Sequence, residues 1–213
     1  MTEHFLVKCF LIGISAASGI GPIFLLTLNR SSLFGFWKGF ATALGAAIAD
    51  TLYFLLAMKG LLSIIESTSK ALLFMEGLSS CLLILFGLHL FRKKPQLDTP
   101  VITNQPLILS TLKSFFLTIL NPFMLFFFVF VSINVLPSGP SILSKKMLLL
   151  GGAAVGCGSL AILTIIAALG ALLGSKIKRS SLEMFSRLTG VIFAGLGVYL
   201  LFDFCAKCLL IPR

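Results

Sequence analysis

Apolar runs of about 20 or more residues recur along the chain, separated by shorter polar or basic connections. A helical run of that length crosses roughly 30 Å of hydrocarbon. The first run is too long for the apolar core of a secretory signal peptide, so we expect it to be retained as a span. The pattern predicts six membrane-spanning helices, near residues 5–29, 39–60, 70–91, 113–136, 147–174 and 185–206. The expected fold is therefore that of an all-α polytopic membrane protein.

The longest connection, "RKKPQLDTPVITNQP", divides the six expected spans into two sets of three. This predicts a first three-helix repeat at 1–94, a cytoplasmic connecting loop at 95–112 and a second three-helix repeat at 113–213. Three crossings reverse the direction of the chain, so the second unit would insert upside down relative to the first. Such inverted repeats are the plan of many secondary transporters.

Two prolines interrupt the expected spans, and they occupy corresponding positions in the two halves. Pro22 follows "SGIG" in the first span and Pro122 follows "ILN" in the fourth. Proline breaks a helix interior but is well suited to begin a new helix, and Asn is a good cap. Freed backbone groups within a bilayer have to be buried in protein or line a wet cavity, and a half-helix start favours an anion. The breaks therefore predict either ordinary kinks or a binding site for a small solute, with the candidate residues Gly19, Gly21, Pro22, Asn121 and Pro122.

Asp50 is the most distinctive polar residue, since "GAAIADTLYFLL" places it near the middle of the second span. An unpaired carboxylate at that depth is costly when ionised, and such residues usually line polar pathways or carry protons. Small neighbours would let another helix approach it closely. Asp50 is therefore the candidate ion-coupling residue, the alternative being a protonated side chain that makes one structural hydrogen bond.

The composition agrees with a membrane protein, at 58% hydrophobic and 11% charged residues. The net charge of +10 does not indicate nucleic-acid binding, because the basic residues lie between the apolar runs. Lys and Arg are in excess in the odd-numbered connections, with Arg30 and Lys38 assigned to the first. By the positive-inside rule this places those connections in the cytoplasm and both termini outside, in the inner cell membrane.

Other chemistries have weaker support in the sequence. Cys205 and Cys208 form a CxxC near the end of the last span, which can mean redox or metal chemistry or simply two small apolar residues. A transmembrane thiol-redox protein would need a cysteine beside each intramembrane proline, whereas Cys9 is far from Pro22. A metal-cation efflux permease, the other alternative, would need several clustered ligands beyond Asp50. We find no nucleophile–base pair, phosphate loop or ligand cluster, so no enzyme, no cofactor and no metal site is predicted.

The chain resembles the lysine exporter (LysE/RhtB) superfamily, especially its homoserine/threonine branch. The first-half pattern of that family is Pro-Gly-Pro, an apolar stretch, an Arg, several glycines and a small residue before Asp. Here it reads "IGPIFLLTLNRSSLFGFWKGFATALGAAIADTLYFLLAMKG". The second-half hallmark, Asn-Pro-Lys before a Phe-rich stretch, reads "LNPFMLFFFVF". Ile20 stands where the family has its first proline, and Phe123 stands where it has the lysine.

This resemblance implies export of amino acids or similar small metabolites from the cytoplasm, driven by a proton or ion gradient through alternating access. Gly21 and Pro22 stand at the first motif, Asp50 at its acidic position, and Asn121 and Pro122 at the second. The expected partners are the small-molecule solute, a proton or cation as coupling ion, and the lipid bilayer, with no nucleic acid. A homodimer is a further expectation for a chain of this size.

Overall fold

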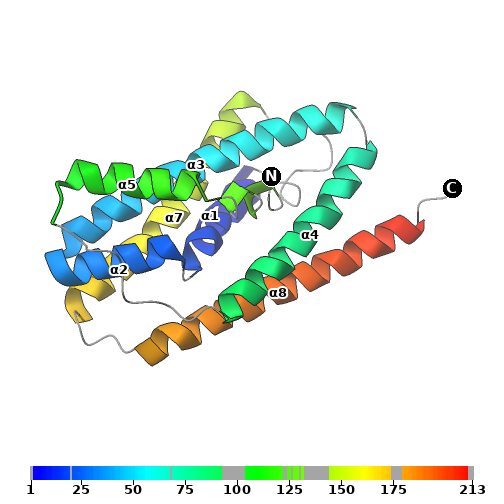
Figure 1. The fold of residues 1–213 in the computed structure, drawn as a ribbon. Helices are drawn as coiled ribbons and strands as arrows, with labels where there is room; N and C mark the ends of the chain where they lie inside the picture. The colour runs from blue at the N-terminus through cyan, green and yellow to red at the C-terminus, as the bar shows by residue number, and fades with distance from the viewer. Residues whose placement is uncertain are drawn as a thin grey trace.

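The computed structural model describes residues 2–19, 21–67, 69–92, 104–121, 124–125, 127–129, 131, 144–173 and 179–210. Within these ranges the chain is helical and contains no strand. The helices are α1 (Thr2–Ser18), α2 (Pro22–Phe34), α3 (Phe36–Ser67), α4 (Ser69–Arg92), α5 (Leu107–Ile119), α7 (Lys145–Leu173) and α8 (Arg179–Leu210) (Figure 1). The all-α class expected from the sequence is confirmed for the described residues.

The chain bends sharply between α1 and α2. Their axes differ by 75° across the break. Gly21 is the N-cap of α2 in an extended conformation, with φ −100° and ψ −173°, and Pro22 is the first residue of the new helix. Proline has no N–H to lose at that position, so it begins a helix there without cost. The half-helix expected from "SGIGP" is thus present and starts at Pro22.

Helix α3 packs against both α7 and α5. Glycine lets α3 and α7 approach closely: a Cβ on Gly39 would lie 2.9 Å from Ala167, and one on Gly152 would lie 2.9 Å from Leu55. From the first contact to the second, the residue number rises along α3, from 39 to 55, and falls along α7, from 167 to 152. The two helices are therefore antiparallel. Small residues at such crossings are typical of helices that associate within a membrane.

Helices α1 and α2 both follow α7. Gly151 lies close to the Phe5 ring, whereas Gly170, nearer the end of α7, lies close to the carbonyl oxygen of Leu28. α1 therefore packs against the first part of α7 and α2 against its last part, with the bend between them.

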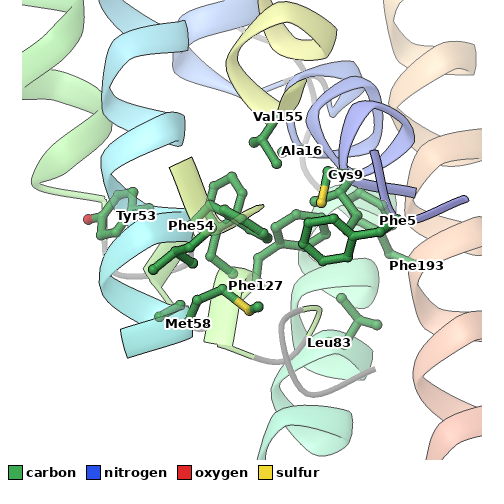
Figure 2. Close-up of a cluster of buried hydrophobic side chains, with 14 residues drawn as sticks. Phe5, Cys9, Ala16, Tyr53, Phe54, Met58, Leu83, Phe127, Val155 and Phe193 are labelled. Atoms are coloured by element: carbon green, nitrogen blue, oxygen red, sulfur yellow. The ribbon is translucent and has the colours of Figure 1, made fainter. Parts of the chain in front are cut away.

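Helices α4 and α8 form an antiparallel pair along one side of the molecule (Figure 1). The two helices approach closely at two facing glycines. A Cβ on Gly87 would lie 2.6 Å from the Gly190 carbonyl oxygen, and a Cβ on Gly190 would lie 2.6 Å from the Gly87 carbonyl oxygen. Figure 2 shows how the pair joins the rest of the bundle, since Leu83 of α4 and Phe193 of α8 lie in the same buried cluster as Phe5 and Phe127.

The outer surface of the bundle is rich in large apolar side chains. Exposed examples occur on every described helix, including Leu172 at 82%, Phe202 at 76% and Ile108 at 73% exposure. A water-soluble protein rarely exposes this much contiguous apolar surface, and a lipid-facing one does. Counted over the described residues, Phe36–Gly60 and Lys145–Leu173 are long and apolar enough to span a membrane, and the bent pair α1–α2 makes a third. The six-span repeat layout stays a prediction.

Several helix bounds differ from the sequence-based expectation: α3 continues to Ser67, beyond residue 60, and α8 runs from Arg179 to Leu210 rather than over 185–206. α2 continues to Phe34, so Arg30 lies inside a helix and is 5% exposed. Its assignment to the first connection was wrong, because the chain has no helix-terminating residue before Gly35, whose φ of 87° ends α2. The same assignment was wrong for Lys38, which lies in α3, since that helix begins at Phe36. α5 begins at Leu107, earlier than the expected start of the fourth span at residue 113.

Candidate functional site

Asp50 is buried where α3 crosses α7, with 2% of its surface exposed. The Ser159 hydroxyl of α7 donates a hydrogen bond to Oδ2 of Asp50. The other carboxyl oxygen, Oδ1, is buried and has no hydrogen-bond partner among the described residues. Buried carboxyl oxygens are nearly always paired, so an unpaired one marks a place where a proton, solute or water is expected to bind.

Small residues explain how a carboxyl group fits at this crossing. Ala46, Ala47 and Ala49 precede Asp50 and are buried. On α7, a Cβ at Gly156 would clash with the Thr51 hydroxyl oxygen of α3. The two backbones are therefore close enough for short side chains from each helix to meet.

The first break lies near this crossing. Ala17 just before it and Leu25 just after it belong to one buried cluster with Ala46 and Leu163. Ala46 is about one turn from Asp50 on α3, and Leu163 is about one turn from Ser159 on α7.

Gly21 leaves room beside the break. A Cβ on Gly21 would have the Gly19 carbonyl oxygen, 3.9 Å away, as its sole neighbour within 4 Å among the described atoms. The Gly21 amide donates a hydrogen bond to the Gly19 carbonyl oxygen at 2.7 Å. The Gly21 carbonyl oxygen accepts one from the Leu25 amide at 3.2 Å, which is the first hydrogen bond of α2. The predicted site residues Gly19, Gly21 and Pro22 thus form a compact turn, in which the two glycines are half-buried and Pro22 is exposed.

The second break is held by Tyr53. α5 ends at Ile119, and the Tyr53 hydroxyl donates to the carbonyl oxygens of Ile119 at 2.5 Å and Asn121 at 3.3 Å. The Asn121 carbonyl also accepts from the Met124 amide at 3.1 Å, so a new turn begins directly after it. Pro122 and Phe123, the remaining residues expected here, lie outside the described residues.

One short stretch of α3 therefore lies beside the second break, and Ala46, one turn before it, packs with residues that flank the first. Asp50 and Tyr53, about one turn apart, contact α7 and the end of α5 respectively. The sequence indicated Asp50 and both breaks but not their partners Ser159 and Tyr53. The available signal was their polarity within runs of small and apolar residues, "GCGSLAIL" and "DTLYFLL".

Arg30 forms a second buried polar group, on α2. One guanidinium nitrogen, Nη2, donates to the Gln105 side-chain oxygen at 3.2 Å, and Lys38 donates to the main-chain oxygen of the same glutamine. The family pattern quoted above, in which an Arg follows the apolar stretch, was a signal that this residue is more than a loop charge.

The alternatives based on cysteine or metal chemistry gain no support from the described residues. Cys9 is buried in the apolar cluster that includes Phe5, while Cys81, Cys157 and Cys205 are exposed. Cys208 lies in α8, but its side chain is outside the part of the chain that the structure describes. In the described part of the chain no group of three or more His, Cys, Asp or Glu residues is placed to hold a metal ion.

A helical bundle with an apolar exterior, a broken helix and a carboxyl group buried between two of its helices is typical of a multi-pass membrane protein. The family model of the LysE type translocators matches residues 14–203, nearly the whole chain. The chain belongs to the LysE type translocator family, whose members are membrane transporters of amino acids or similar small molecules rather than enzymes. No curated relative and no solved structure matches it.

Proposed function

We propose that this protein is a secondary exporter that moves amino acids or similar small metabolites out of the cytoplasm by proton-coupled alternating access. The observation that carries the proposal is the Asp50 carboxyl group, buried between α3 and α7 with one oxygen paired and the other without a described partner. Family membership supports the substrate class.

Asp50 can couple proton movement to a change of conformation because its charge and its burial are linked. An ionised carboxylate with an unpaired oxygen is unfavourable in a water-free interior, whereas a protonated one is tolerated. The ionised form therefore favours a conformation in which water reaches Asp50, and the protonated form favours closure. A proton gradient would then bias the direction of the cycle.

The two breaks supply the surfaces that would enclose the solute. Gly19, Gly21 and Pro22 lie at the interruption between α1 and α2, and Asn121, whose carbonyl accepts from Tyr53, follows the end of α5. The proposal assigns the solute site to these residues together with Pro122. Interrupted helices are tolerated within a membrane where they line a cavity, and paired breaks commonly form the substrate site of transporters with inverted repeats.

The orientation belongs to the same proposal. The excess of Lys and Arg in the odd-numbered connections favours a cytoplasmic location for the connection between α2 and α3. It favours an external location for both termini. A homodimer in the inner membrane is the assembly we expect.

Transport into proteoliposomes with an imposed pH gradient tests the proposal. A panel of radiolabelled amino acids would identify the solute, and Asp50→Asn would then be compared with wild type. We expect Asp50→Asn to lose gradient-driven accumulation while retaining exchange of solute across the membrane, since the amide cannot release a proton. Glu3→Gln, the same chemical change at an exposed carboxylate in the first turn of α1, is the matched control. Gradient-driven accumulation by Asp50→Asn at the wild-type rate would contradict the role of Asp50.

A further inference from the structure

A second feature lies about one turn from the aqueous end of α2, where a cation is buried without a full set of partners. Arg30 is 5% exposed, yet its Nε and Nη1 atoms have no hydrogen-bond partner among the described residues. These atoms carry most of the N–H donors of a guanidinium group. The one described partner, Gln105, is neutral and uses only Nη2.

The surroundings of Arg30 add further donors and positive charge. Lys38, at the start of α3, donates to the main-chain oxygen of Gln105, so two cations converge on one uncharged residue. Thr27 lies one turn before Arg30 on the same face of α2. It is fully buried, and its hydroxyl oxygen has no described partner either.

Burial of an arginine without a counter-charge is unfavourable, and such groups normally pair with an anion. Arginine is also the side chain best suited to a carboxylate, because its planar donors match two oxygens. The local geometry is therefore that of an anion site whose anion comes from outside the described chain.

The position of the site favours a transported carboxylate as that anion. Gly35 ends α2 about one turn after Arg30. Trp37, at the start of α3, is 66% exposed, as expected for an aromatic residue at the membrane–water interface. Leu25 and Leu28, on the same helix, pack in one cluster with Ala17, which lies just before the first break. α2 thus connects Arg30 at the interface with the break at Gly21 and Pro22.

We propose that Arg30, with Thr27 and Lys38, binds the carboxylate of the solute at the entrance of the translocation path. This inference rests on the proposed function, since it assumes that the solute is an amino acid. In this proposal the solute carboxylate first contacts Arg30, which is well separated from Asp50 along the chain. Recognition of the carboxylate and proton coupling are then carried out by different side chains. The head group of an anionic lipid offers the same chemistry and is distinguished in the test.

The test compares ligands with and without a carboxylate on the intact, purified protein. L-threonine, L-leucine and L-lysine would each be titrated against the corresponding amino-acid amide, which keeps the amine and the side chain. We expect the acids to bind wild type roughly 10- to 100-fold more tightly than the amides, the range for hydrogen bonds to a charged group. Arg30→Gln should remove this preference, lowering affinity for the acid while leaving affinity for the amide unchanged.

Each other result has a distinct meaning. Equal binding of acid and amide by wild type, which requires no variant, would overturn the proposal, as would a preference that persists in Arg30→Gln. If Arg30→Gln does not fold, Arg30→Lys keeps the charge but loses the planar donors, and it should show a reduced preference. Failure of every amino acid to bind would contradict the proposed function itself.

The lipid alternative is tested by reconstitution. The same titrations in phosphatidylcholine vesicles, with and without phosphatidylglycerol, should give the same preference for the acid. Loss of the preference when phosphatidylglycerol is added would show that the head group occupies the site, and would overturn the assignment to the solute.

Discussion

Ser159 of α7 donates a hydrogen bond to one carboxyl oxygen of Asp50 on α3, and the second oxygen of the same carboxyl group has no described partner. The two residues are 109 positions apart in the chain. They come from the second and fifth expected spans, which correspond to each other in the two halves. The hydrogen bond therefore joins the two proposed repeats at the residue to which we assign coupling.

The Asp50–Ser159 hydrogen bond should contribute measurably to stability. We expect Ser159→Ala to destabilise the folded protein by about 1–3 kcal/mol, because it leaves a buried carboxyl group with no partner. Thermal unfolding in detergent would measure the loss. The same substitution made in an Asp50→Ala background should cost much less, since the double-mutant cycle removes both ends of the interaction. Equal costs in the two backgrounds would show that the serine acts through packing alone.

Tyr53 should stabilise the end of α5 through its hydroxyl group. Tyr53→Phe keeps the ring, which stacks on Phe128 with centroids 6.0 Å apart, and removes the hydrogen bonds to the carbonyls of Ile119 and Asn121. We expect a loss of about 1–2 kcal/mol, measured as a lower melting temperature. Tyr199, the other tyrosine of the chain, is 69% exposed, so Tyr199→Phe is the matched control and should have little effect. A similar shift for both variants would exclude a specific role for Tyr53.

The features that the sequence predicted well are those with a local cause. The start of α2 at Pro22 follows from the backbone chemistry of "SGIGP", and the burial of Asp50 follows from its place within an apolar run. The partners Ser159 and Gln105 could not be predicted in the same way, because each contact depends on how distant helices pack. The prediction for Arg30 was wrong for a related reason: a charge at the end of an apolar run suggests the end of a helix, yet α2 continues to Phe34.

Close packing of α1 on α7 should make Gly13 intolerant of a side chain. A Cβ at Gly13 would lie 2.8 Å from the Ser159 amide nitrogen and would clash with the Val155 carbonyl oxygen. Both are backbone atoms that cannot rotate away, so we expect Gly13→Ala to lower stability by about 1–3 kcal/mol. A Cβ on Gly195 of α8 would have no described atom within 4 Å, so Gly195→Ala should be neutral or stabilising by up to about 1 kcal/mol. Thermal unfolding of the two variants, each at a helical glycine, would separate the effect of the crossing from that of helix propensity.

Gly21 gives the most direct test of where the solute binds. Its φ of −100° is accessible to alanine, and the nearest described atom to a new Cβ would be 3.9 Å away, so Gly21→Ala should fold with an unchanged melting temperature. If the space beside the break holds the solute, the added methyl group reduces that space, and we expect KM to rise roughly 10-fold or more. Gly195→Ala, which also adds one methyl group to open space, should leave KM unchanged. Unaltered transport by a normally folded Gly21→Ala variant would mean that the solute does not contact this break, and the binding site would then have to lie on the Asn121 side of Asp50.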